Sequence, residues 1–303
     1  MTEIAAPLSP SGTPVGAVAP PALSTRTLWR RYFSSRVSTS AFAVLVLLLV
    51  LTAFGPALAP YPQHITGTVA TANRFEPPSS THLFGTNELG QDVLSLVLGG
   101  ARVSILTAIA IIASSALIGT IVGALAGFFG RLADEVLMRF TDLMLTIPSL
   151  ILAMAVAAAL GPGIANLIIA ITLATWPGYA RLVRGEVRAV KLELYVEAAM
   201  AMGASPWRIL LRHVLPNIAP TIIVKMSLEI SFAIITVASL GFIGIGVKPP
   251  TPEWGAMLSN ARGYMPGYWW IAIFPGLAIM ISVFAFNLFG DGLREALDPK
   301  SDR

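Results

Sequence analysis

The sequence predicts an all-α membrane protein with six transmembrane helices, and three observations carry this prediction. Of the 303 residues, 55% are hydrophobic and only 12% are charged, a balance that soluble domains rarely have. Several apolar runs reach or exceed the roughly 18 residues that mark a membrane helix. The chain has no cysteine, which excludes disulfides, thiolate zinc sites and cysteine nucleophiles.

Residues 1–36 are expected to form a cytoplasmic N-terminal tail, most of it disordered. The tail begins with a stretch rich in Pro, Ala, Ser and Gly, and four arginines follow before the apolar run 41–59. This order resembles a secretory signal, and Ala57-Leu58-Ala59 resembles a cleavage site. The preceding segment is long, however, and Pro60 stands directly after the cleavage position. We therefore expect 41–59 to remain as the first span.

The next segment, 60–102, is polar and rich in proline, and its apolar positions 94–98 leave two structures open. They favour a short interfacial helix, and an ordinary loop packed on the bundle fits equally well. Residues 103–130 carry no charge and form the second expected span. Residues 131–142 are charged and are expected to be a short link.

A second charge-free stretch, residues 143–180, is too long for a single span. Gly161-Pro162-Gly163 divides it, so we expect a third span at 143–160, a tight hairpin, and a fourth span at 164–180.

The rest of the chain supplies a polar loop and two more spans. Residues 181–216 form the loop, and the fifth and sixth spans are expected at 217–246 and 268–290. Residues 37–299 would then form one transmembrane domain, and 300–303 a short C-terminal tail.

The distribution of Lys and Arg predicts the orientation of these spans. Fifteen of the 20 lie before span 1, between spans 2 and 3, between spans 4 and 5, or after span 6. Four lie on the opposite side, and Lys225 lies within span 5. Positive loops stay in the cytoplasm, so both termini and the loop 181–216 are expected there. We therefore interpret the net charge of +4 as a consequence of membrane topology. It indicates membrane lipid, and not nucleic acid, as the surrounding partner.

A helix–turn–helix is predicted within the loop 181–216. Residues up to Met202 are good helix formers, and Gly203 stands where a helix ends in a left-handed residue. Ser205 is then a candidate N-cap, and Pro206 fits the first position of a second short helix from Trp207 to Val214. Pro216 is expected to close this unit directly before span 5.

The same residues resemble the EAA loop of ABC importer membrane subunits. The resemblance rests on Glu197-Ala198-Ala199, on Gly203 four residues later, and on Leu215-Pro216. It implies a cytoplasmic loop whose short helix sits in a groove of an ATP-hydrolysing subunit. His213 departs from the family pattern, which has Ile there. The residues implied to dock and couple are Glu197, Ala198, Ala199, Gly203, Ala204, Ser205, Pro206 and Trp207. An interfacial helix pair without a partner is the alternative.

Further segments resemble the C-type subunit of peptide/nickel-type permeases. They are the motifs ARLVRG at 180–185, LGFIGIG at 240–246, PPTPEWGAML at 249–258 and NLFGDGLREALDP at 287–299, together with 82–102. The resemblance implies the type I ABC importer fold in the bacterial inner membrane. It also implies a heterodimer with a second permease subunit, two ATPase subunits and an extracytoplasmic substrate-binding protein. Its substrates would be dipeptides or oligopeptides, or alternatively glutathione, nickel complexes or another small solute.

The chain shows no GxxxxGK[ST] phosphate loop, so we expect ATP and Mg²⁺ to be used by partner subunits and no cofactor to bind here directly. The chain is therefore not expected to be an enzyme. Its three histidines form no HExxH motif. Gly290-Asp291 resembles part of the motif of intramembrane aspartyl proteases, but Leu288 stands where that motif has a further glycine. An ATP-independent channel or carrier is the rival class, and it leaves the EAA-like loop unexplained.

Two patterns within the spans have both a structural and a functional interpretation. Lys225 and Glu229 are four residues apart and can form an ion pair, either at the pore or as a structural contact toward a partner subunit. Gly119, Gly123 and Gly127 repeat every four residues, which favours close helix packing or simply reflects a helix of small residues.

Overall fold

The computed structural model describes residues 25–297, and their regular structure is helical throughout, apart from one isolated β-bridge between Thr86 and Asp92. The helices follow one another as α1 (Thr25–Tyr32), α2 (Arg36–Leu58), α3 (Pro62–Ile65), α4 (Val93–Phe129), α5 (Arg131–Thr146), α6 (Ser149–Leu160), α7 (Ile164–Lys191), α8 (Leu194–Ala201), α9 (Pro206–Ile209), α10 (Leu215–Ile243), α11 (Trp254–Ala261) and α12 (Trp270–Leu297). Short 3₁₀ turns lie at Thr71–Asn73 and Arg262–Tyr264, and a π-helical turn lies at Leu210–Val214.

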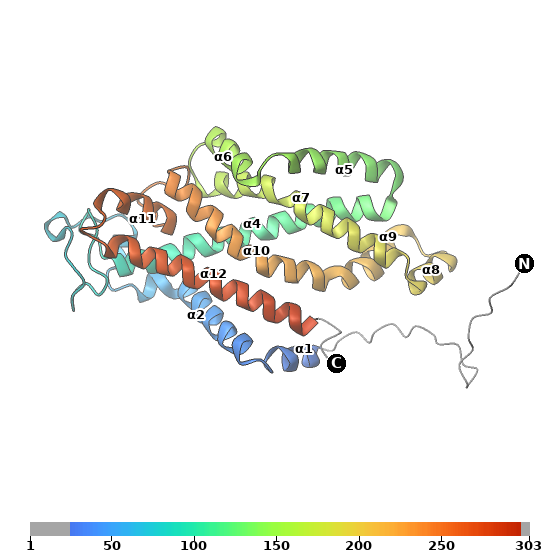
Figure 1. Ribbon diagram of the computed structural model, residues 1–303, viewed down its shortest axis with the longest axis horizontal. Coiled ribbons are helices and arrows are strands. Elements are labelled where there is room, and N and C mark those ends of the chain that lie inside the picture. Colours follow the sequence, from blue (N-terminus) through green and yellow to red (C-terminus); the bar gives the residue numbers. More distant parts are fainter. Residues whose placement is uncertain (1–24, 298–303) are drawn as a thin grey trace, which may run out of the picture.

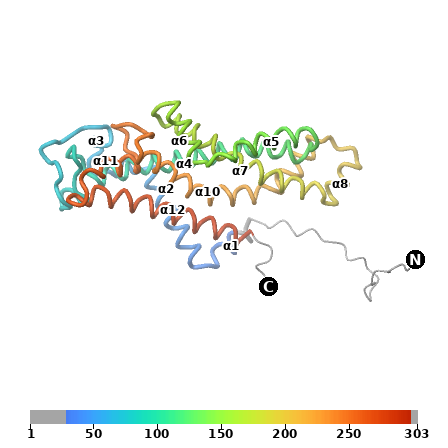
Figure 2. Tube along the Cα trace, turned by 45° about the horizontal axis from the view of Figure 1, so that its top comes forward, coloured from blue at the N-terminus to red at the C-terminus, as the bar shows by residue number. Residues whose placement is uncertain are grey.

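The long helices run lengthwise beside one another and make an elongated bundle (Figure 1). Helix α4 packs along α7, while α10 packs on α12 and α4. One end of the bundle carries α11 and the loops of 60–92, and the other end carries α8 and α9 (Figures 1 and 2). Helix α1 packs against α12, near the end of the described chain.

Four helical runs are long and apolar enough to cross a membrane, namely those at 36–58, 93–129, 206–243 and 270–297. A fifth crossing is available if the bent pair α5 and α6 counts as one. Helix α7 is long enough at 28 residues, but charged side chains occupy its second half. The six expected spans thus correspond to four straight runs, one bent pair and α7.

The third span is the clearest correction, because 143–160 is not one helix. Helix α5 ends at Thr146, α6 begins at Ser149, and the two helices meet at 88°. Pro148 causes the break: a residue that precedes proline is forced out of the helical region, and Ile147 is extended, with φ −90° and ψ 127°. The expected link 131–142 is wrong as well, since it forms most of α5.

Two further boundaries differ from expectation. The apolar positions 94–98 are neither a separate interfacial helix nor a loop, because they form the first turns of α4. Asp92 begins this helix by accepting a hydrogen bond from the Ser95 amide at 2.8 Å. At the N-terminal side, the expected tail is partly helical over α1; residues 1–24 and 298–303 lie outside the described residues.

Pro216 does not separate the loop from span 5. Helicity continues from Pro206 to Ile243, through the π-helical turn Leu210–Val214 that directly precedes the proline. A proline ring clashes with the carbonyl one turn earlier, and widened turns are one way in which a helix accommodates such a local mismatch. The part of the loop from Pro206 onward and α10 therefore form one continuous helical element.

The glycine stripe of α4 makes the close helix contact that its spacing favoured. A Cβ added at Gly119 would lie 2.7 Å from the carbonyl oxygen of Trp176, and one added at Gly123 would lie 2.4 Å from that of Ala180. At Gly127 the nearest atom would be the carbonyl oxygen of Arg184, at 2.9 Å. These three positions let the backbones of α4 and α7 meet directly.

Candidate functional site

The segment from α8 to α9 turns as the sequence predicts. Gly203 is left-handed with φ +77°. The turn is closed by the Gly203 amide, which donates to the Met200 carbonyl at 3.0 Å, and by the Ala204 amide, which donates to the Ala199 carbonyl at 3.1 Å. Pro206 opens α9 as expected. Ser205 occupies the N-cap position, but its side chain accepts no capping hydrogen bond.

A hydrophobic cluster fixes this turn to the ends of α4 and α7. It consists of buried side chains from α4, α7, α8, α9, the π-helical turn and α10: Ala124, Phe128, Val183, Val187, Val196, Ala199, Ile209, Leu210, Val214 and Ile218. Lys191 supports it from the side, because its Nζ donates to the Phe128 carbonyl at 2.6 Å and lies 5.2 Å from the centre of the Phe128 ring. The turn is thus packed onto the bundle rather than suspended as a free loop.

The opposite side of the turn exposes large apolar side chains to solvent. We call it the end surface, defined by Leu192, Leu194, Met202, Trp207 and Leu211, which are 76%, 74%, 82%, 55% and 58% exposed. Several large, exposed apolar side chains gathered in one short segment at the tip of a molecule are typical of a protein–protein interface.

The predicted docking residues divide between the two sides of the turn. Glu197 and Ala198 are exposed beside the end surface, together with Gly203, Ser205 and Pro206. Ala199 is buried in the hydrophobic cluster, so it contributes packing and not outer surface. Ala204 is half-buried and packs against the same cluster. Glu193 and Glu197 lie at the start of α8, where negative charge is favourable.

Ion pairs join α5 to α7 between the end surface and the expected third and fourth spans. Asp134 accepts hydrogen bonds from Nε and Nη2 of Arg184, the second at 2.7 Å, and Arg188 lies 3.6 Å away. The Arg184 hydrogen bond lowers the pKa of Asp134, although burial opposes it. A second, exposed pair joins Arg181 to Asp142. These ion pairs hold α5 against α7, although the two helices are not directly connected by a turn.

The ion pair expected in span 5 is present. Lys225 Nζ lies 2.5 Å from Glu229 Oε1, with side chains 26% and 31% exposed. The Lys225 ammonium also lies 5.0 Å from the centre of the Tyr179 ring of α7, and Tyr179 itself is fully buried. The pair therefore lies where α7 and α10 meet, with part of its surface open.

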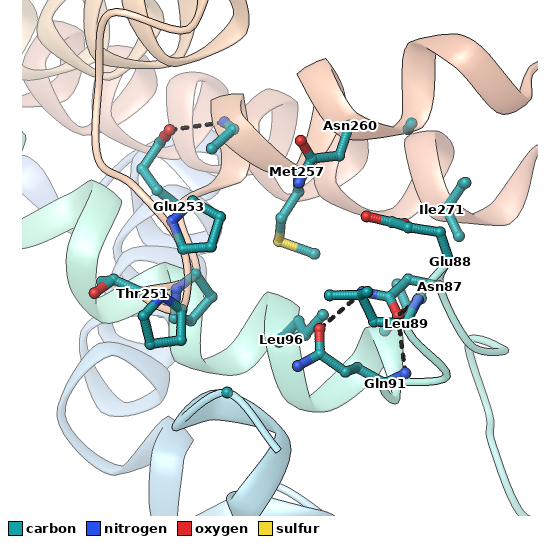
Figure 3. Close-up of a pocket in the computed structure, with 17 residues that line it drawn as sticks. Asn87, Glu88, Leu89, Gln91, Leu96, Thr251, Glu253, Met257, Asn260 and Ile271 are labelled. Carbon is teal, nitrogen blue, oxygen red and sulfur yellow. Dashed lines mark hydrogen bonds between the residues drawn. The ribbon is translucent and has the colours of Figure 1, made fainter. Parts of the chain in front are cut away.

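The far end of the bundle holds a pocket of about 150 Å³ between two segments distant in sequence (Figure 3). One wall comes from the loop before α4 and includes Asn87 and Gln91, whose side chains bond each other at 3.0 Å. The other wall runs from Pro249 into α11, where Met257 points into the space. Glu253 is at this wall, but both its oxygens accept hydrogen bonds from backbone amides of Gly255 and Ala256 at 2.8 Å.

A buried histidine network, which sequence reasoning missed, anchors the loop 60–92 to the start of α4. Asp92 accepts hydrogen bonds from His82 Nδ1 at 2.9 Å and from the Ser95 hydroxyl at 2.7 Å, and its amide donates to His64 Nδ1 at 2.9 Å. Tyr61 stacks on His64. Burial lowers the pKa of His64, although the Asp92 charge opposes this. The histidines and Asp92 of this network are too far apart in the chain for sequence spacing alone to pair them. Within residues 25–297, no three acidic, His or Cys side chains gather as metal ligands would.

Comparison with known proteins gives concordant matches. Residues 119–303 match the family model of binding-protein-dependent transport system inner membrane components, and residues 25–78 match the N-terminal TM domain of oligopeptide transport permease C. The probable D,D-dipeptide transport system permease protein DdpC of Escherichia coli K12 is 44% identical over 91% of both chains. The glutathione transport system permease protein GsiD of Pectobacterium atrosepticum is 43% identical, again over 91% of both.

Two other similarities agree with these. The di/tripeptide transport system permease protein DppC of Pseudomonas aeruginosa is 41% identical over 91% of this chain and 92% of its own. An inward-facing structure of the MetNI methionine ABC transporter shares the fold, with a TM-score of 0.52 and 19% identity over 67% of this chain and 97% of that one. The chain is therefore a multi-pass membrane protein with the type I ABC importer fold, and it belongs to the family of binding-protein-dependent transport system inner membrane components.

Proposed function

We propose that this chain is the C-type permease subunit of an ATP-driven importer of dipeptides or short oligopeptides. It would work by alternating access in the bacterial cytoplasmic membrane, paired with a second, homologous permease subunit. Two ATPase subunits would use ATP and Mg²⁺ on the cytoplasmic side, and a substrate-binding protein would deliver the peptide from outside. The relatives DdpC and DppC are named as dipeptide and di/tripeptide permeases, which supports peptides as the substrate class.

The end surface is the observation that carries the proposal. It is apolar and exposed, its turn is packed onto α4 and α7, and its second half, Trp207 and Leu211, belongs to the helical run that continues into α10. A rigid element of this kind transmits a displacement of the end surface directly to a membrane span. An ATPase groove that holds Trp207 and Met202 would therefore move α10 when the ATPase subunits close.

The orientation follows from the charge bias and fits the shape of the bundle. The arginine-rich helix α1 and the end of α12 lie away from α11 and the loops of 60–92, toward the end surface (Figures 1 and 2). Both termini and the end surface would thus be cytoplasmic. A reporter that is active only in the cytoplasm should be active when fused after Arg303 and silent when fused after Pro252. The reverse pattern of reporter activity would contradict this topology.

Gly203→Val tests the coupling role. The residue is left-handed with open space around it, so valine adds backbone strain of roughly 1 kcal/mol or more without a clash. The strain should tilt α9 and displace Glu197 and Trp207 from the groove. Assembly with the sister subunit should persist, whereas peptide uptake and the stimulation of ATP hydrolysis by the loaded binding protein should fall sharply.

Gly161→Val is the control, because Gly161 also has a positive φ, +81°, and also has open space around it. It lies in the turn between α6 and α7, far from the end surface. If both variants lose uptake equally, strain alone explains the loss. Full uptake by Gly203→Val would show that this turn does not couple hydrolysis to transport.

A further inference from the structure

The ion pair of α10 lies at the middle of its helix. Helix α10 runs from Leu215 to Ile243, so Glu229 has 14 residues on either side. At 1.5 Å per residue it lies about 21 Å from each end. Lys225 lies one turn nearer the end surface. In a helix that crosses the membrane, this position is deep within the hydrocarbon, beyond the reach of a lysine side chain to the headgroups.

The pair lies where α10 meets α7 and keeps part of its surface open, whereas another side of α10 is buried. Ser227 and Ser231, on another side of α10, are buried, and the Ser231 hydroxyl donates to the Val283 carbonyl of α12 at 3.0 Å. Lys225 and Glu229 are each more than a quarter exposed, and Phe232 on the same strip is 52% exposed. Charges deep in a membrane face a water-filled cavity or another protein surface and not lipid. This strip of α10 therefore faces either the translocation path or the sister subunit.

The pair also keeps hydrogen-bonding capacity to spare. A lysine ammonium has three N–H donors and a carboxylate two oxygens, whereas the pair is joined through Nζ and Oε1 alone. The Tyr179 ring shields one side of Nζ. Two N–H donors and one carboxylate oxygen are thus not used within the pair itself.

The spacing of the two charges suits a short zwitterion. Four residues of helix rise about 6 Å, and two residues of extended peptide span roughly 7 Å. A dipeptide carries an ammonium at one end and a carboxylate at the other, so it can lie along α10 and meet an opposite charge at each end. The pair is neutral in sum and the substrate is too, so no net charge is brought into the membrane.

We propose that Lys225 and Glu229 line the translocation path and bind the carboxylate and the ammonium of a zwitterionic peptide in transit. This rests on the proposed peptide import. The ion pair opens as the peptide arrives, each charge exchanges its partner for a peptide end, and the pair closes behind the departing substrate. Peptides that contain proline or bulky side chains would pass equally well, provided that both of their ends are free. The pair therefore selects for charged peptide ends and not for side chains.

The test uses the complete transporter, with its sister subunit, ATPases and binding protein, reconstituted in vesicles. The variants are Lys225→Gln, Glu229→Gln and the double variant, and the readouts are assembly, stimulated ATP hydrolysis and dipeptide uptake per ATP hydrolysed. The conservative Lys225→Arg and Glu229→Asp keep the charges. Ser239→Ala is the matched control, because the Ser239 hydroxyl bonds only its own helix backbone, at the Ile235 carbonyl.

Each single neutral variant should lower uptake per ATP roughly tenfold, because a charged hydrogen bond to one peptide end is lost. The double variant removes the unpaired charge and should restore any assembly lost in the single variants, yet its uptake should stay about as low. Lys225→Arg and Ser239→Ala should stay close to wild type.

Normal uptake per ATP in the double variant would overturn the inference, because a purely structural pair would then be enough. Normal uptake in both single variants would overturn it as well. A wrong proposed function would give a different result. The wild-type transporter itself would then import no dipeptide, while its ATP hydrolysis would be stimulated by the binding protein loaded with another substrate.

Discussion

Gly123→Ala gives a sharp test of how closely α4 and α7 pack. The new Cβ would lie 2.4 Å from the Ala180 carbonyl oxygen and 2.9 Å from the Val183 Cβ. Real Cβ contacts are essentially never shorter than 3.0 Å, so the helices must separate by at least about 0.6 Å at this point. The obstacle is backbone and cannot rotate away. We expect overpacking to cost up to about 3 kcal/mol, offset by about 1 kcal/mol of better helix propensity.

Gly185→Ala is the matched control, because Gly185 lies in α7 with nothing within 4 Å of its added Cβ. It should be neutral or stabilising by up to about 1 kcal/mol. Because both variants make the same chemical change, their difference of about 3 kcal/mol isolates the overpacking. The measurement is the free energy of unfolding of each purified chain in mixed detergent and SDS micelles. Equal stabilities would refute direct backbone contact between α4 and α7.

Three further predictions concern charged groups outside the four long apolar helical runs. Asp134→Asn should destabilise the α5–α7 contact by about 1.5–3 kcal/mol in the same unfolding assay. Acid should do the same, because the lowered pKa of Asp134 gives stability that is present above about pH 4. This stability is lost as the pH falls through the pKa that Asp134 has in the folded chain. The lowered pKa of His64 gives stability that is full above its ordinary value of about 6.5 and is lost on acidification below it, so amide protection factors in 60–92 should fall there in the wild type but not in His64→Gln. Glu253→Ala should cost about 1–2 kcal/mol, because it removes the cap of α11 and leaves the amides of Gly255 and Ala256 without their acceptor; a smaller loss than that of exposed Glu295→Ala would contradict this.

Local rules predicted what depends on local sequence. The helical positions of α2, α4, α10 and α12 follow from apolar runs, and the left-handed turn at Gly203 follows from a glycine after good helix formers. The Lys225–Glu229 pair also follows from spacing along one helix. These are the features whose partners lie within about one turn of each other.

Apolarity alone could not locate breaks within an apolar run. The stretch 143–160 has no charge, so its hydropathy is uniform, and only the steric effect of Pro148 on Ile147 divides it. The reverse error occurred at Pro216, where a helix end was expected and a π-helical turn keeps the helix continuous.

Contacts between distant segments were beyond the reach of spacing rules. The His64 ring and the Asp92 amide come together across 28 residues, because the loop 60–92 folds back on the start of α4. Ala198 and Ala199 look alike in sequence, yet only the docking of α8 on the hydrophobic cluster decides that Ala199 is buried and Ala198 exposed. Such side-chain directions are set by tertiary packing and not by propensity.

The most direct test of the account is whether the end surface sits in an ATPase groove. The chain has no cysteine, so Met202→Cys introduces a single thiol at an 82% exposed position, and Leu83→Cys does the same in the loop before α4, at 60% exposure. A short bifunctional cross-linker is added to the assembled transporter, and its products are identified by mass. The account predicts a product that joins Cys at 202 to an ATPase subunit, and none from position 83. An ATPase product from position 83, with none from 202, would contradict it.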